Sequence, residues 1–133
     1  MKQTYFCPLD HFGSLRLTGQ DANKFLQGQI TCNVNIVTQS MGQAGAYCTP
    51  KGNAIANFDL VVHGDTLLLH MPSTMVSAVQ KAMAKYIVFS KAQLTDTSND
   101  WCRLAVWGDD AAACMQDAFG SVPEKRLAIV QNE

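Results

Sequence analysis

The fold of this chain is decided by residues 17–34, which read LTGQDANKFLQGQITCNV. A strand ends at Gly19, and Asp21 can cap a short helix over 21–28. Gly28 falls near the end of that helix, where a glycine can adopt a left-handed conformation without steric cost. The apolar residues of the segment recur at helical spacing, and they are Ala22, Phe25, Leu26 and Ile30. We therefore expect a strand, a turn and a capped helix here.

Polar side chains alternate with apolar ones directly after this helix. Gln29 and Asn33 carry side-chain amides and Thr31 carries a hydroxyl, and an apolar residue follows each of the three. Short polar groups in this arrangement either satisfy the backbone at the helix end or contact a ligand. These residues by themselves leave both interpretations open.

Length and composition describe a globular region. The chain has 133 residues, of which 47% are hydrophobic and 16% are charged. This length fits one domain or an incomplete part of a larger protein. The formal net charge of −1 provides no basic field, so we expect no direct binding of nucleic acid.

The five cysteines are odd in number and include no Cys-x-x-Cys pair. This disfavours a disulfide framework, a zinc ribbon and an iron–sulfur cluster held by the protein alone. Reduced thiols are typical of a reducing compartment. The sequence also lacks the pattern of a signal peptide, and no apolar run reaches the roughly 18 residues of a membrane span. We therefore expect a cytoplasmic location without membrane contact.

Hydrophobic periodicity predicts helices that alternate with antiparallel hairpins. After an irregular lead-in, strands are expected at 15–17, 44–49, 53–63, 66–71, 91–97 and 103–107, and a further strand from 126 with no visible pairing partner. Helices are expected at 21–28, from Ser73 as N-cap to 89, and at 108–119, and the lead-in covers 1–13. The dipeptide Gly64-Asp65 predicts a two-residue hairpin. The pattern indicates an α+β fold, an antiparallel sheet with helices packed on one face.

No arrangement of side chains marks a catalytic or metal site. His63 and His70 flank the hairpin and could lie opposite each other, but no thiol or carboxylate stands at ligand spacing. The serines lack a nucleophile-elbow context, and the glycines form neither a phosphate loop nor a dinucleotide fingerprint. Phe12 fits either a stacking platform or an ordinary core residue. Lys51 beside Gly52 suits an anionic group but is equally typical of a solvated hairpin.

Four stretches stand in an order and spacing that together resemble one known family. The first consists of Thr18-Gly19-x-Asp21 and Phe25-Leu26-Gln27-Gly28-Gln29-Ile30-Thr31-x-Asn33-Val34. The others are Pro50-Lys51-Gly52, Lys85-Tyr86-x-Val88-Phe89-Ser90-Lys91 and Val106-Trp107-Gly108. Over about residues 8–120 the chain is similar to the folate-binding YgfZ family, whose members are related to the glycine-cleavage T-protein, an aminomethyltransferase.

This resemblance implies the N-terminal part of a three-domain ring that binds tetrahydrofolate in its central hole. Residues 1–133 would form this N-terminal folate-binding region, with a possible sub-boundary near 41–44. Family members support the biogenesis or repair of iron–sulfur enzymes, including those that thiolate tRNA. The implied partners are therefore folate and, indirectly, iron–sulfur enzymes, without direct contact to nucleic acid. The oligomeric state stays open.

The resemblance also implies which residues bind folate. Phe12 stands where the bacterial proteins have a tryptophan, a change that keeps a stacking face and loses the indole N–H donor. Gln29, Thr31 and Asn33 would line the rim of the pocket, and Lys51 would meet the anionic tail of folate. No catalytic or metal-binding residue is expected.

Two departures from the family pattern leave alternatives. The Lys-Gly-Cys-Tyr-x-Gly-Gln-Glu motif of full-length members is absent, so their key cysteine has no counterpart here. The aminomethyltransferases place a catalytic aspartate soon after the turn glycine, whereas Asp59 follows about two positions late. Aminomethyl transfer is therefore the second hypothesis, and it depends on Asp59. The third is a non-catalytic fragment or interaction domain that associates with itself through an unpaired strand edge.

Overall fold

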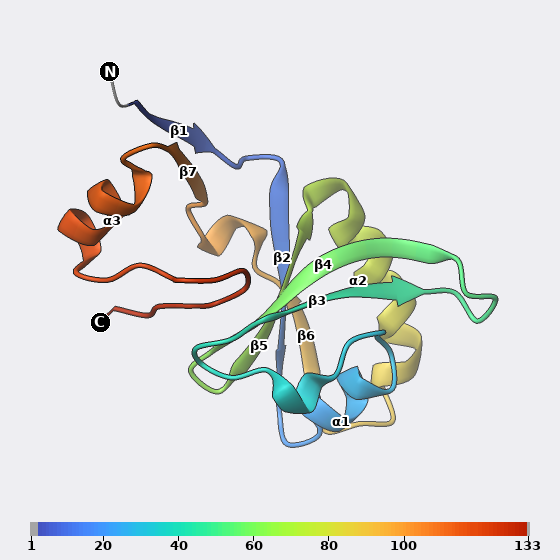
Figure 1. Cartoon of the computed structure of the whole chain (residues 1–133). Coiled ribbons are helices and arrows are strands. Elements are labelled where there is room, and N and C mark those ends of the chain that lie inside the picture. Colours follow the sequence, from blue (N-terminus) through green and yellow to red (C-terminus); the bar gives the residue numbers. More distant parts are fainter. Residues whose placement is uncertain (1–2, 133) are drawn as a thin grey trace.

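Two antiparallel sheets of unequal size organise residues 3–132, the part of the chain that the computed structural model describes (Figure 1). The strands are β1 (Thr4–Pro8), β2 (Phe12–Thr18), β3 (Gln43–Cys48), β4 (Ala54–His63), β5 (Thr66–Pro72), β6 (Gln93–Asp96) and β7 (Leu104–Gly108). The helices are α1 (Ala22–Gln27), α2 (Ser73–Ile87) and α3 (Ala111–Phe119), with short 3₁₀ helices at Val34–Ile36 and Ser98–Asp100. The larger sheet has the order β3-β4-β5-β2-β6, and the smaller pairs β1 with β7.

The core lies on one face of the five-stranded sheet. Alternate strand residues point to this face, as the two-residue period of a strand requires, and Leu15 and Leu69 are completely buried there. Val79 and Met83 of α2 complete the core from the helix side, and Phe25 of α1 also contributes to it. Helices therefore cover one face of an antiparallel sheet, so the expected α+β architecture is confirmed. The division into two sheets was not expected.

The other face of the large sheet is only partly covered, and the hairpin between β4 and β5 determines which side chains meet there. The predicted hairpin turn is correct, because His63 pairs with Thr66 across Gly64, whose φ is +56°. This register places Asp59 opposite His70. The two histidines that flank the turn therefore do not lie opposite each other.

The expected irregular lead-in over 1–13 is wrong, because Thr4–Pro8 and the residues from Phe12 onward form two strands, while residues 1–2 lie outside the described part of the chain. β1 pairs with β7, about a hundred residues later in the chain, and β2 already begins at Phe12. A five-residue strand with a cysteine and a terminal proline carries too little periodicity to be detected locally. Its partner is a distant segment that no local pattern can identify.

The predicted helix caps differ from the structure in their details. The Asp21 side chain makes no capping bond to α1, and instead its Oδ2 accepts a hydrogen bond from the Lys91 N–H at 2.8 Å. Gly28 has a right-handed φ of −79°, not the expected left-handed conformation. Pro72 rather than Ser73 occupies the N-cap position of α2, and the Ser73 N–H donates to the His11 carbonyl. At Asp21 and Ser73 a tertiary partner takes the place of the local one, whereas the Gly28 N–H donates within α1 to the Phe25 carbonyl.

The expected strand from residue 126 is also wrong. Residues 126–131 follow α3 as an irregular segment that makes one isolated bridge, between Ala128 and Met41. The Gly42 N–H donates to the Leu127 carbonyl, and the Ile129 N–H donates to the Ser40 carbonyl. Leu127 has a positive φ of 63°, which interrupts the extended backbone that a strand needs. The segment therefore lies beside the large sheet without joining it.

Candidate functional site

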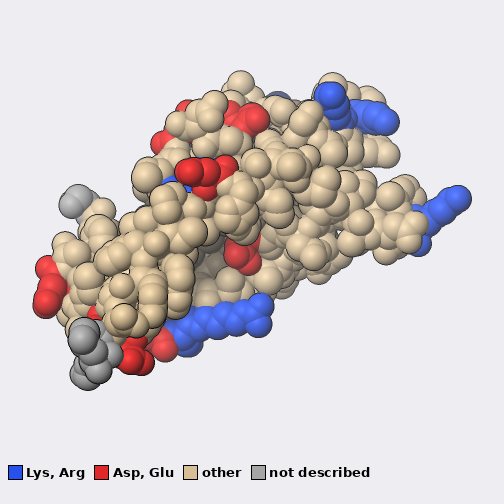
Figure 2. Space-filling view, turned by 90° about the horizontal axis from the view of Figure 1, so that it is seen from above, with Lys and Arg blue, Asp and Glu red and all other residues tan. Residues whose placement is uncertain are grey.

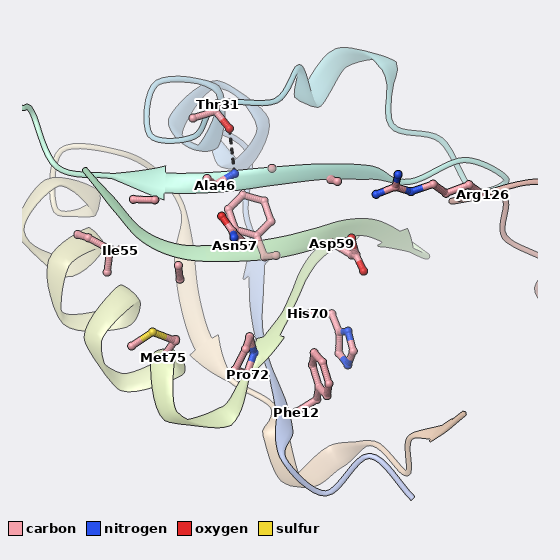
Figure 3. Close-up of a pocket in the computed structure, with 15 residues that line it drawn as sticks. Phe12, Thr31, Ala46, Ile55, Asn57, Asp59, His70, Pro72, Met75 and Arg126 are labelled. Carbon is pink, nitrogen blue, oxygen red and sulfur yellow. Dashed lines mark hydrogen bonds between the residues drawn. The ribbon is translucent and has the colours of Figure 1, made fainter. Parts of the chain in front are cut away.

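A hollow of about 790 Å³ lies on the open face of the large sheet, opposite the core. Its floor is formed by β3 and β4, and its sides come from the start of β2, the end of β5 and the first turn of α2 (Figure 3). The labelled residues that line it are Phe12, Thr31, Ala46, Ile55, Asn57, Asp59, His70, Pro72, Met75 and Arg126. The hollow therefore combines an apolar floor with a few polar and charged groups, as small-molecule sites do.

Two stacked rings form one wall of this hollow. The ring centroids of Phe12 and His70 are 4.7 Å apart, and the ring planes are inclined by 13°. They meet because β2 and β5 are neighbours in the sheet, with Phe12 opposite Pro72. The ring of His11, the residue before Phe12, contacts the Phe12 ring with 4.8 Å between the two ring centroids. A flat ligand can extend such a stack at low cost.

The charge state of His70 follows from its surroundings. Burial lowers the pKa of His70, and the Arg103 guanidinium lowers it further, whereas the Asp59 carboxylate raises it. The net shift is downward, so the imidazole is neutral at pH 7. A neutral imidazole offers one hydrogen-bond donor and one acceptor to a ligand beside the ring stack.

A carboxylate and a guanidinium also face the hollow. Asp59 projects from β4 toward the hollow, and Arg126 reaches its edge from the segment that follows α3 (Figure 3). Asn57 lies two residues before Asp59, on the same face of β4. The site therefore presents an anion, an amide and a cation along one side of an apolar floor.

The structure brings some of the residues predicted from the sequence to this hollow and leaves others outside it. Phe12 and Thr31 line it, and the Thr31 hydroxyl accepts a hydrogen bond from the Ala46 N–H at 2.9 Å. Asn33 caps the 3₁₀ helix at Val34–Ile36 by accepting from the Asn35 N–H.

Gln29 and Lys51 are not among the residues that line the hollow. The Gln29 backbone closes the end of α1 by donating to the Leu26 carbonyl. Lys51 is exposed in the turn between β3 and β4, where Gly52 adopts a φ of +83°.

A second, smaller hollow of about 390 Å³ lies beside the first one. Asp59 and His70 line both hollows and form the partition between them. Leu68 and Val61 contribute to the apolar lining of the second hollow, together with residues 127–129. Trp101 stands at its edge, in edge-to-face contact with His63 at 5.2 Å.

A buried polar network supports the partition. Arg103 Nη2 donates to the Ser14 hydroxyl at 2.8 Å, and that hydroxyl also bonds the Thr97 hydroxyl at 3.0 Å. Arg103 Nη1 donates to the Ser98 carbonyl at 2.9 Å. Because Ser14 is already engaged and only 3% exposed, it is a structural residue rather than a nucleophile.

Of the five cysteines, all within residues 3–132, Cys102 lines the second hollow and the other four line neither hollow. Cys32 is buried against Gly45, and burial raises the pKa of its thiol, so it packs as a small apolar side chain. Within residues 3–132 no group of three or more His, Cys, Asp or Glu side chains could hold a metal ion. No helix in the same range is long and apolar enough to cross a membrane. On the face seen in Figure 2, basic side chains form small separate groups rather than one continuous patch.

Comparison with known proteins identifies the family. The family model of the GCVT N-terminal domain matches residues 2–130. The chain belongs to the GCVT N-terminal domain family. It is 33% identical over 131 residues to the tRNA-modifying protein YgfZ of Colwellia psychrerythraea, and 29% identical over 125 residues to that of Hamiltonella defensa. The resemblance to YgfZ-type relatives of the T-protein is thereby confirmed.

The chain spans only part of these relatives. The two alignments cover 98% and 94% of this chain but 40% and 37% of the two YgfZ proteins. The glycine cleavage system aminomethyltransferase T from Bartonella henselae has the same fold, with a TM-score of 0.78 and 16% sequence identity. That match covers 90% of this chain and 32% of the aminomethyltransferase.

The sequence contains a signal for some of the remaining site residues and none for others. The hairpin turn fixes the pairing of β4 with β5, so Asp59 and His70 could have been placed opposite each other from Gly64-Asp65 alone. Asn57 follows from the alternation along β4. Arg126 had no local signal, because it lies in an irregular segment that only tertiary contacts bring to the sheet.

Proposed function

We propose that this chain is the tetrahydrofolate-binding region of a YgfZ-type accessory protein that supports iron–sulfur enzymes and, through them, tRNA thiolation. The observation that carries this proposal is the Phe12–His70 ring stack beside Asp59 and Arg126. Membership of the GCVT N-terminal domain family and the similarity to tRNA-modifying proteins also support this proposal. Any effect on tRNA would be indirect, since the chain carries a formal net charge of −1.

The residues present fit the chemistry of folate. Its flat pterin would extend the stack of Phe12 and His70. Asp59 and Asn57 would accept hydrogen bonds from the N–H groups of the pterin. Arg126 would pair with a carboxylate of the glutamate tail, since guanidinium and carboxylate match in a bidentate geometry. Thr31 and Ala46 would border the ring, held together by their mutual hydrogen bonds.

Titration with tetrahydrofolate and 5-formyltetrahydrofolate tests the binding. The readouts are the melting temperature and the fluorescence of the two tryptophans, of which Trp101 lies at the edge of the second hollow. We expect saturable binding that Phe12→Ala weakens about tenfold, or ~1.4 kcal/mol. Phe119→Ala is the matched control, because Phe119 is an exposed phenylalanine on α3. A folded chain that gives no response to either folate contradicts the proposal.

The wider role requires a separate test in cells. Cells that lack their own YgfZ-type protein would receive this chain or the Phe12→Ala variant. Restoration of thiolated tRNA nucleosides by the wild-type chain, and less by the variant, supports the accessory role. Folate binding in vitro without any restoration would limit the proposal to folate binding.

A second candidate is a folate-dependent one-carbon transferase. The position of Asp59 favours it, because this carboxylate faces both hollows and could hold a proton at a reacting nitrogen. On this hypothesis Asp59→Asn would lower the rate of folate-dependent aminomethyl transfer at least about a hundredfold while folate still binds. The absence of transfer by the wild-type chain would eliminate this candidate.

A further inference from the structure

The second hollow is bounded by three segments of the described chain. Its floor contains Val61 of β4 and Leu68 of β5, which are directly opposite partners in the sheet. Residues 101–103, before β7, form one wall, and residues 127–129, after α3, contribute another. The side chain of Gln131 holds this second wall to the sheet by donating to a carbonyl of β4 at 3.0 Å. The volume of about 390 Å³ is in the range of small-molecule sites.

Arg103 lines this hollow, and neutral groups hold its guanidinium in place. Nη1 donates to the Ser98 carbonyl at 2.9 Å and to the Trp101 carbonyl at 3.3 Å, and Nη2 donates to the Ser14 hydroxyl at 2.8 Å. Within residues 3–132 no carboxylate forms an ion pair with Arg103. A guanidinium has five N–H donors, so these three bonds leave donors available to a ligand. The fixed and half-buried cation therefore suits an anion, since little water compensates its charge.

The carboxylate of Asp59 lies at the other end of the partition from Arg103. Ser14, His70 and Asp59 are directly opposite partners on β2, β5 and β4, so they form one row across the sheet. Neighbouring strands are about 4.8 Å apart, which places Asp59 about 10 Å from Ser14 and its bond to Arg103. The partition therefore has a positive end and a negative end, and an anion in the second hollow would occupy the positive end.

We propose that the second hollow binds an aliphatic monocarboxylate, with the carboxylate on Arg103 and the hydrocarbon chain against Val61, Leu68 and residues 127–129. The aliphatic lining favours a hydrocarbon chain, because a polar body would lose its hydrogen bonds to water there. Among the described residues that line the hollow, Arg103 is the one lysine or arginine, and it matches a single carboxylate in a bidentate geometry. Asp59 would repel a second negative charge. The inference does not depend on folate binding.

Titration with octanoate and with 1-octanol tests the proposed ligand class. The two probes share a hydrocarbon chain and differ in charge, and both are used below the concentrations at which they aggregate. Calorimetry measures the affinities, and the fluorescence of Trp101 at the edge of the hollow reports on the same binding. We expect saturable binding of octanoate, at least about tenfold tighter than that of 1-octanol, because hydrogen bonds to charged groups are the stronger ones. A folded chain that does not bind octanoate, or that binds both probes equally well, overturns the proposal.

A charge variant tests the role of the guanidinium. Arg103→Met should weaken octanoate binding at least about tenfold and leave the affinity for 1-octanol unchanged. Lys125→Met is the matched control, because Lys125 is an exposed cation on the segment that follows α3, and both affinities should stay as in the wild type. Far-UV circular dichroism establishes that both variants are folded. An equal loss for the two probes in folded Arg103→Met, or an equal loss of octanoate binding in both variants, contradicts the role of Arg103.

A second variant locates the ligand without changing Arg103. Ala128 lines the second hollow and not the first one, so the larger side chain of Ala128→Phe would fill the space of the hydrocarbon chain. We expect this variant to weaken the binding of both probes at least about tenfold. Octanoate binding that Ala128→Phe leaves unchanged would place the ligand outside the second hollow and would also overturn the proposal.

Discussion

Leu69 in the five-stranded sheet is completely buried, whereas Trp107 in the two-stranded sheet is half exposed, although both residues lie in antiparallel strands. The large sheet has two helices against one face, and that face holds the core. Within residues 3–132, α3 is the helix that packs beside the small sheet, and none of the residues of α3 is buried. Strand pairing alone therefore does not make a core. A sheet becomes stable when another layer covers its apolar face.

The largest expected difference between the two regions concerns stability. Leu69→Ala would leave a cavity in the core and should lower the free energy of unfolding by about 2–5 kcal/mol. Phe6→Ala should cost less than about 1 kcal/mol, because its ring is already half in solvent. Urea denaturation of both variants measures the difference. Equal losses would show that the small sheet contributes as much stabilisation as the core.

The second prediction concerns the connection between the two regions. Arg103 immediately precedes β7, and it donates a hydrogen bond to Ser14 of the large sheet. Arg103→Met would leave polar groups unsatisfied and should destabilise the fold by about 1–3 kcal/mol. It should also raise the pKa of His70, because the guanidinium lowers that pKa.

Urea denaturation and an NMR titration of His70 provide the two measurements. Lys125→Met, which removes an exposed cation, is the control. An unchanged pKa of His70 would mean that the two regions are not electrostatically coupled.

The third prediction separates two cations in folate binding. Arg126 lines the first hollow, and Lys51 lies in the exposed β3–β4 turn. Arg126→Ala should weaken binding about fivefold, close to 1 kcal/mol for an exposed ion pair, while Lys51→Ala should have a smaller effect. Calorimetric titration with tetrahydrofolate compares the two. A larger loss of affinity for Lys51→Ala than for Arg126→Ala would instead support the prediction from the sequence that Lys51 meets the anionic tail of folate.

The smallest expected effect is a pH dependence of stability. The folded state lowers the pKa of His70, mainly by burial, so the unfolded chain binds more protons at mildly acidic pH. This contribution to stability is complete above about pH 6.5, the ordinary histidine pKa, and is lost as the pH falls through the lower folded-state value. Melting temperatures between pH 7.5 and 5 should therefore fall more for the wild type than for His70→Gln. Equal decreases in melting temperature for the wild type and His70→Gln would contradict the lowered pKa of His70.

Sequence reasoning recovered the larger elements of the fold because they carry strong periodic patterns. The alternation along β4, the glycine turn and the apolar face of α2 each predict their structure locally. It failed at β1 and at residues 126–131, where the backbone conformation depends on a partner far away in the chain. The caps at Asp21 and Ser73 failed for the same reason, since both groups bond to distant segments.

The candidate site shows the same division. Phe12 and Thr31 were named from the family resemblance, and both line the hollow. His70 and Asp59 could be paired by counting from the hairpin turn, although their meeting with Phe12 depends on β2 lying beside β5. Arg126 could not be anticipated, because no periodic pattern places an irregular segment on a sheet.

The α+β class, the β4–β5 hairpin, the long helix and the family can be predicted from the sequence, because they depend on local periodicity and on motifs in register. The two-sheet arrangement, the separation of two hollows by Asp59 and His70, and the cation that Arg126 supplies there emerge only from the folded chain. Side chains far apart in the chain meet only after strand pairing and helix packing fix the order of the sheet.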